Sequence, residues 1–100
     1  MITTKQRAYL RSLGSTLTPI FQIGKGGIEE NFLTQVSQAL EARELIKIKV
    51  LENSGLESRE ASDMICKAIG CEGVQAIGNK IVLYKQSSNI KKRKIELPTK

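Results

Sequence analysis

A tetrapeptide of three glycines and one lysine, Gly24-Lys25-Gly26-Gly27, follows the short apolar segment 19–23 and precedes a helical pattern. Glycine allows a backbone to approach a ligand closely, and the N–H groups at the start of a helix attract anions. Lys25 adds a cation at the tip of the predicted loop. These residue types, in this order, indicate a site that binds phosphate groups.

This glycine loop lacks the signatures of nucleotide-hydrolysing and dinucleotide-binding proteins, because GxxxxGK[ST] and GxGxxG are both missing. The spacing that it does have is GxxG, with which KH domains clamp a nucleic-acid backbone. A tight strand-to-helix turn is the alternative explanation, but such a turn needs one or two glycines rather than three. We therefore expect the loop to contact nucleic-acid phosphates through Gly24, Lys25, Gly26 and Gly27.

Positive charge collects at the two ends of the chain. The net charge is +6, yet residues 1–28 contain four basic residues and no acidic one, and residues 29–72 contain nine acidic and five basic residues. Residues 86–100 contain five basic residues and one glutamate. A segregated basic surface attracts polyanions such as RNA. Arg7 and Arg11 lie four residues apart, so we expect them to share an exposed helical face that extends the basic surface.

The residue inventory excludes several classes of site. The chain has no histidine and two cysteines, which rules out Ser-His-Asp and Cys-His catalysis and a four-ligand zinc site within one chain. We expect a protein that is not an enzyme, with no cofactor, no metal and no small-molecule substrate. Its two cysteines, Cys66 and Cys71, are expected to be reduced. No apolar run approaches about 18 residues and none suits a signal peptide, so we expect a cytoplasmic protein without a membrane partner.

The periodicity of apolar residues predicts three helices. Thr3 or Thr4 caps the first helix, with Gln6 in a capping box, and the helix runs to Thr18 before Pro19. Its buried stripe is Leu10, Leu13 and Leu17. The second helix spans 28–43, with two glutamates in its first turn. The third begins near Ser58 as its cap and runs to Ile69 before Gly70.

Four strands complete the predicted fold, at 19–23, at 44–51, and in a hairpin over 73–85 that turns at Gly78-Asn79. In segment 44–51, Ile46, Ile48 and Val50 alternate with Lys47 and Lys49, so one sheet face meets the core and the other meets solvent or a partner. The order helix-strand-helix-strand-helix-strand-strand predicts an α/β fold, in which helices pack on a mixed four-stranded sheet. The strand–helix–strand unit over 19–51 gives its parallel pair.

We expect a domain over residues 1–86 and a basic C-terminal tail over 87–100. The tail has no apolar period, and its charge run at 91–94 is typical of a solvated, mobile segment. Ile95 and Leu97 can dock it locally on the domain. We expect a chain ending at Gln86 to fold normally, and unfolding of that chain would place Ile95 and Leu97 in the core.

Four segments in order, "TTKQRAYLRSL", "LTPIFQIGKGG", "ALEARELIKIKVLENS" and "VQAIGNKIVLYK", resemble the CRM domain family, in its small stand-alone bacterial YhbY-type form. The resemblance covers residues 1–86. It implies a fold similar to the C-terminal domain of translation initiation factor three, RNA binding, and association with precursors of the large ribosomal subunit. It maps the family's GxxG loop onto residues 24–27 and its basic first-helix positions onto Lys5, Arg7 and Arg11.

The partner implied is therefore RNA, read through its backbone. The chain has four aromatic residues, of which Phe21 and Phe32 fit apolar stripes, so a base-stacking platform is not supported. The alternative is a protein-interaction adaptor, in which the acidic helices at 28–43 and 56–69 dock a ribosomal or assembly protein. Steep salt dependence of RNA binding favours the first interpretation, and salt-insensitive capture of a protein favours the second.

Overall fold

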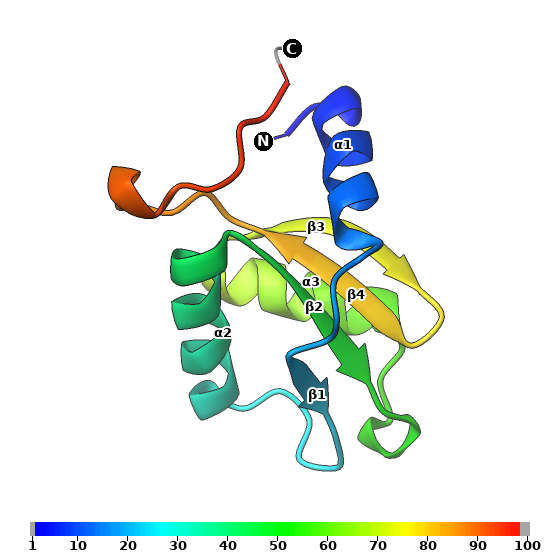
Figure 1. Ribbon diagram of the computed structural model, residues 1–100. Coiled ribbons are helices and arrows are strands. Elements are labelled where there is room, and N and C mark those ends of the chain that lie inside the picture. The colour runs from blue at the N-terminus through cyan, green and yellow to red at the C-terminus, as the bar shows by residue number, and fades with distance from the viewer. Residues whose placement is uncertain (1, 99–100) are drawn as a thin grey trace.

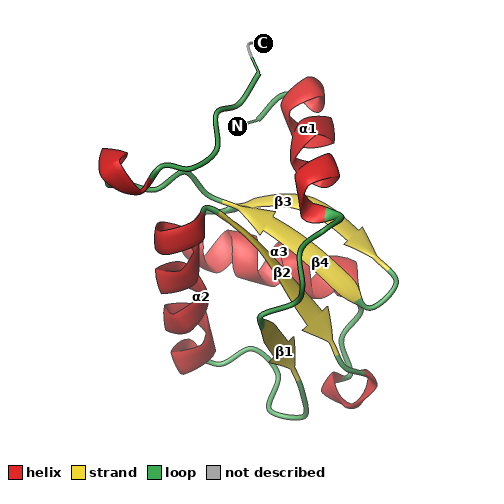
Figure 2. Ribbon diagram, viewed as in Figure 1, coloured by secondary structure: helices red, strands yellow, loops and turns green. Residues whose placement is uncertain are grey.

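The computed structural model describes residues 2–98. Within them, three α-helices pack on one four-stranded sheet (Figures 1 and 2). In chain order the elements are α1 (Thr4–Gly14), β1 (Phe21–Ile23), α2 (Glu30–Arg43), β2 (Leu45–Val50), α3 (Ser58–Ile69), β3 (Glu72–Ile77) and β4 (Lys80–Tyr84). Short 3-10 helices span Glu52–Ser54 and Ile90–Lys92. This order confirms the predicted α/β fold class.

The sheet is mixed, with strand order β1-β2-β4-β3. β1 runs parallel to β2, while β4 is antiparallel to both of its neighbours, β2 and β3. The predicted parallel pair and the hairpin around Gly78-Asn79 are thus confirmed. The two edge strands are β1, which leads into the glycine loop, and β3, which follows α3.

α2 and α3 cover one face of the sheet, and α1 lies on the other (Figure 1). Ile46, Ile48 and Val50 of β2 are buried under α2 and α3, as their alternation predicts. The opposite face was expected to meet solvent or a partner. The structure instead covers part of it with a second cluster, which includes Leu10, Leu45, Val74, Val82 and Tyr84.

α1 begins as predicted and ends earlier than predicted. Thr3 caps it, and the side chains of Thr3 and Gln6 form the reciprocal capping box. The helix ends at Gly14 rather than at Thr18. A Cβ atom at Gly14 would lie 2.9 Å from Cγ1 of the buried Val82, so glycine lets the end of the helix approach the sheet closely. Leu17 still packs on the second cluster, but from the segment after the helix.

We predict that Gly14→Ala destabilises the domain by about 1–2 kcal/mol, because the new methyl group overpacks the contact with Val82. Helix propensity alone predicts the opposite sign, a gain of up to about 1 kcal/mol. Urea unfolding of Gly14→Ala with and without Val82→Ala checks this. The loss should shrink or reverse once Val82 is truncated, and an equal loss in both backgrounds would contradict the packing explanation.

The other two helices each start at a different residue from the one predicted. α2 begins at Glu30 instead of Ile28. α3 is capped by Glu57, which forms a capping box with Glu60, and Ser58 is its first residue. The Ser58 hydroxyl donates instead to the carbonyl of Gly78 at 2.6 Å, which ties α3 to the hairpin turn.

Two glutamates attach the segment after β4 to the domain. Glu41 lies in α2, and Glu44 is the residue that caps the C-terminus of α2. The Glu41 carboxylate accepts hydrogen bonds from the serines and the asparagine at 87–89. Glu44 accepts from backbone N–H groups farther along the segment. Ile95 and Leu97 then pack on the second cluster beside α1, so the docking that the sequence left open does occur.

Candidate nucleic-acid interface

The glycine loop is a closed turn at one end of the sheet, where β1 leads toward α2 (Figure 1). The N–H of Gly27 donates to the carbonyl of Gly24 at 2.9 Å, and Lys25 and Gly26 form the exposed tip. Gly27 has a φ of 69°, a conformation that glycine adopts without strain.

The fold itself requires only one of the three loop glycines. A Cβ atom at Gly24 would make ordinary contacts at 3.8 Å, to Asn53 and Leu51. At Gly26 it would meet only the flexible end of the Glu29 side chain, at 2.9 Å. Backbone conformation thus explains Gly27, but neither of the other two.

The start of α2 is less favourable to an anion than the sequence suggested. Because the helix begins at Glu30, two residues separate its first turn from the glycine loop. Glu29, the residue at the cap, makes no side-chain capping bond, and its carboxylate lies against Gly26. That carboxylate repels an incoming phosphate, so attraction must come from the tip of the loop and from cations beyond it.

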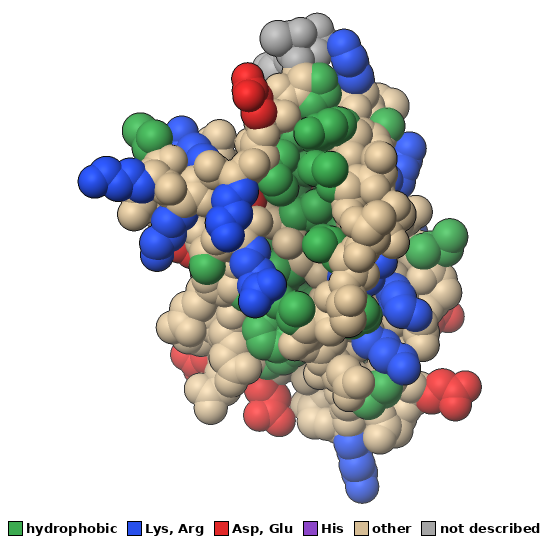
Figure 3. All heavy atoms as spheres, viewed as in Figure 1, with side chains coloured by type: hydrophobic (Ala, Val, Ile, Leu, Met, Phe, Trp, Pro, Cys, Tyr) green, Lys and Arg blue, Asp and Glu red, His purple; other side chains and the backbone are tan. Residues whose placement is uncertain are grey.

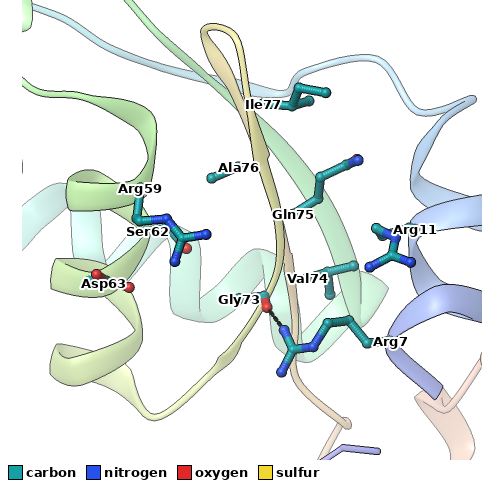
Figure 4. A pocket seen from close by; sticks show the side chains of 10 residues that line it. All are labelled: Arg7, Arg11, Arg59, Ser62, Asp63, Gly73, Val74, Gln75, Ala76 and Ile77. Atoms are coloured by element: carbon teal, nitrogen blue, oxygen red, sulfur yellow. Dashed lines mark hydrogen bonds between the residues drawn. The ribbon is translucent and has the colours of Figure 1, made fainter. Parts of the chain in front are cut away.

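The basic residues of α1 lie on the opposite side of the sheet from the glycine loop. Lys5 and Arg11 are exposed. Arg7 was expected to be exposed but is half-buried, because its guanidinium reaches over the edge strand and donates to the carbonyl of Gly73 (Figure 4). Since α1 lies beside β3 and the glycine loop follows β1, the structure does not bring the two groups of candidate residues together.

Three lysines on the sheet lie between them. Lys49 of β2 is directly opposite Lys80 of β4, and Gln22 of β1 is the neighbour of Lys49 on its other side. Lys47 lies on the same face two residues before Lys49. We call Lys47, Lys49 and Lys80 the basic strip. In Figure 3, Lys and Arg side chains follow the right-hand margin of this face.

The basic strip carries an electrostatic cost. Like charges directly opposite each other on a sheet are destabilising, and a bound polyanion would remove the repulsion between Lys49 and Lys80. The sequence showed Lys47 and Lys49 to be on the outer face. It did not single out Lys80, because that residue joins the strip only through the register of β2 with β4.

The aromatic residues do not form a surface for stacking bases on the sheet. Phe21 and Phe32 pack edge to face with ring centroids 5.8 Å apart, against the cluster under α2 and α3. Tyr84 is buried, and Tyr9 is partly exposed on α1. The available contacts on this surface are therefore mostly cations and backbone amides, which recognise phosphate groups rather than bases.

No group of three or more His, Cys, Asp or Glu side chains within residues 2–98 could hold a metal ion. The sulfur atoms of Cys66 and Cys71 lie 3.4 Å apart, with the Cys71 thiol donating to Cys66. That hydrogen bond lowers the pKa of the Cys66 thiol, against the opposing effect of burial. None of the helices in the part of the chain described is long and apolar enough to cross a membrane.

Fold and surface together define a small α/β domain with a glycine loop at one edge of its sheet, basic side chains across one face, and few exposed aromatics. Residues 2–85 match the CRS1/YhbY (CRM) domain. The chain belongs to this family, as the four sequence segments indicated.

Similar proteins cover almost the whole chain. A Bacillus subtilis protein named "Probable RNA-binding protein YqeI" is 49% identical over 98% of this chain and 100% of its own length. A Haemophilus influenzae "RNA-binding protein" is 38% identical over 99% of this chain and 97% of its own length. The solution structure of the hypothetical protein SAV1595 from Staphylococcus aureus has a TM-score of 0.75 and 44% identity, and the match covers 98% of this chain and 100% of that one.

Proposed function

We propose that this chain is a cytoplasmic RNA-binding protein, not an enzyme, that contacts the RNA backbone through the glycine loop and the basic face of the sheet. Gly24 and Gly26 let phosphate approach closely, with the conformation of the loop set by Gly27, and Lys25 pairs with a phosphate. Lys5, Arg7 and Arg11 extend the interface along α1. The target is structured ribosomal RNA in precursors of the large subunit, as the family resemblance implies.

The observation that carries the proposal is the opposed pair of Lys49 and Lys80 on the sheet face. The pair costs stability in the free protein, and phosphate binding would reverse that cost. It lies between the glycine loop and α1, so one RNA contacting both regions would pass over it. The family match and the names of the relatives from Bacillus and Haemophilus support RNA as the partner.

The adaptor alternative loses support from the contacts made by α2. Glu41, which lies within that acidic helix, and Glu44 at its C-terminal cap both bind the chain's own segment 87–95. These two carboxylates are therefore already occupied. A partner protein that docked on them would first have to displace that segment.

Lys25→Ala tests the loop. Affinity for an RNA hairpin of about 20 base pairs, measured by fluorescence anisotropy over a salt series, should fall, and the slope of log K against log salt should decrease by roughly 0.7–0.9 for one lost phosphate contact. The loss should be similar for hairpins of different sequence.

Lys67→Ala is the matched control, because Lys67 is exposed in the last turn of α3. It should leave both the affinity and the slope near the parental values. Salt-insensitive binding by the parent protein, or equal effects of the two substitutions, would count against the loop as a phosphate site.

A further inference from the structure

The free edge of β3 forms the floor of an open cleft of about 710 Å³. α1 contributes one wall, from one face of the sheet, and α3 contributes the other, from the opposite face (Figure 4). Arg7 and Arg11 reach the cleft from α1, and Arg59 reaches it from α3. We call this the arginine cleft.

The arginine cleft has an excess of positive charge. Its lining contains three arginines and one acid, Asp63. In Figure 4 the guanidinium of Arg59 extends toward β3, whereas the Asp63 side chain lies on α3 at a greater distance from that strand. The planar guanidinium donates two parallel hydrogen bonds to phosphate oxygens, which makes a group of arginines suited to phosphodiesters.

The position of Arg59 is unfavourable for the helix that carries it. Arg59 is the second residue of α3, where the helix dipole is positive, and a cation there is destabilising. The helix dipole therefore gives no reason for an arginine at this site, and Asp63, four residues later, can offset only part of its charge. Binding of an anion in the cleft does give one.

The edge of β3 is poorly suited to the other common occupant of such a site, an extended peptide that adds a strand. Arg7 already donates to the carbonyl of Gly73, and the register of β3 with β4 shifts between Gly73 and Gln75. Both features interrupt the regular ladder of groups that an added strand would need. A guanidinium has five N–H donors, so the bond to Gly73 leaves Arg7 able to bind an anion as well.

We propose that the arginine cleft binds a phosphodiester of the RNA backbone, at a position separate from the glycine loop. β1 and β3 are the two edges of the sheet, and three strand spacings separate them by about 14 Å. The loop and the cleft therefore take different phosphates of one RNA, and the basic strip lies between them. This inference rests on the proposed RNA-binding function and adds Arg59 to the interface.

Arg59→Ala tests the cleft, with Arg43→Ala as the matched control, since Arg43 is exposed on α2 and does not line the cleft. With the same hairpin, Arg59→Ala should weaken binding several-fold and decrease the salt slope by roughly 0.7–0.9. Arg43→Ala should do neither. Arg59→Lys, which keeps the charge but not the fork of donors, should retain the slope and lose part of the affinity.

The outcomes separate this inference from the proposed function. If the parent binds the hairpin and Lys25→Ala weakens it, while Arg59→Ala behaves like Arg43→Ala, the cleft is not a phosphate site and the loop proposal stands. If Lys25→Ala and Arg59→Ala each weaken binding and their free-energy losses add in the double variant, two separate phosphate contacts are supported. Loss of RNA binding together with a large fall in the melting temperature of Arg59→Ala would assign Arg59 a structural role and overturn the inference.

Discussion

Replacing Glu44 with glutamine will destabilise this domain by about 2–4 kcal/mol, which is the expected cost of weakening charge-assisted hydrogen bonds and leaving a buried donor unpaired. Glu44 is fully buried at the end of α2. Its carboxylate accepts from the N–H groups of Ser87 at 2.7 Å, of Lys94 at 2.7 Å and of Ile95 at 3.0 Å. An amide of the same size has one oxygen, and its NH2 group cannot accept from a backbone N–H.

Glu41→Gln is the comparison for this prediction, because its side chain binds the same segment from a more exposed position. Urea unfolding should show a much smaller loss for Glu41→Gln than for Glu44→Gln. Hydrogen exchange at the amides of Lys94 and Ile95 should rise more in Glu44→Gln. Equal losses for the two variants would mean that the buried carboxylate does not hold the segment.

The same two carboxylates make the folding stability of the domain depend on pH. Burial raises the pKa of Glu44, but the three N–H donors outweigh it and hold the pKa below its ordinary value of 4.5. Hydrogen bonds from Ser88, Ser87 and Asn89 lower the pKa of Glu41 to about 2. Depressed carboxyl pKa values contribute stability above the unfolded pKa, and this contribution is lost as the pH falls from about 4.5 toward 2. Glu44→Gln should therefore remove the share of this acid dependence that Glu44 contributes below pH 4.5, as urea unfolding at a series of pH values would show.

These contacts change what the sequence implied about the C-terminal segment. The charge run at 91–94 predicted a solvated tail, because solvated tails have this composition. The partners of Glu44, however, are backbone N–H groups, which every residue except proline has, so no side-chain pattern marks them in advance. A chain ending at Gln86 would leave the Glu44 carboxylate without these three donors and would remove the packing of Ile95 and Leu97.

The fold was predictable where one local signal decided the outcome. The capping box at Thr3 and the alternation in 44–51 both gave the observed structure. The end of α1 was not predictable, because the reason for Gly14 is the side chain of Val82, a residue 68 positions away in the sequence. A contact between residues so far apart in the sequence produces no periodic pattern of residue types from which it could be predicted.

Part of the candidate site was likewise predictable from local sequence, and part depended on the tertiary fold. The glycine loop was visible in the sequence because glycine at consecutive positions is unusual without a local reason. Arg59 was hidden within a helix that has as many acidic as basic residues, and only the pairing of β3 with β4 and the packing of α3 bring it to the cleft that α1 also lines. Sequence spacing finds groups on one element, and the tertiary fold decides which elements share a surface.

Gly27→Asp will weaken RNA binding by about tenfold or more relative to Gly27→Asn, since a like charge close to phosphate costs more than 1.4 kcal/mol at modest screening. The two substitutions form a matched pair. Gly27 has a φ of 69°, which asparagine and aspartate both tolerate better than other side chains, and no atom lies within 4 Å of the new Cβ position. They share whatever strain the left-handed backbone adds and differ by one negative charge.

Melting temperatures of the two variants should therefore agree closely, and anisotropy with the RNA hairpin should separate them. Raising the salt concentration should reduce the difference in RNA affinity between the two variants, because screening weakens repulsion between charges near the surface. Equal affinities of two folded variants would remove the loop from the interface and leave the basic strip and the arginine cleft as the candidate phosphate contacts. An affinity difference that stays the same at high salt would assign the effect to local geometry, because salt screens the repulsion between exposed charges.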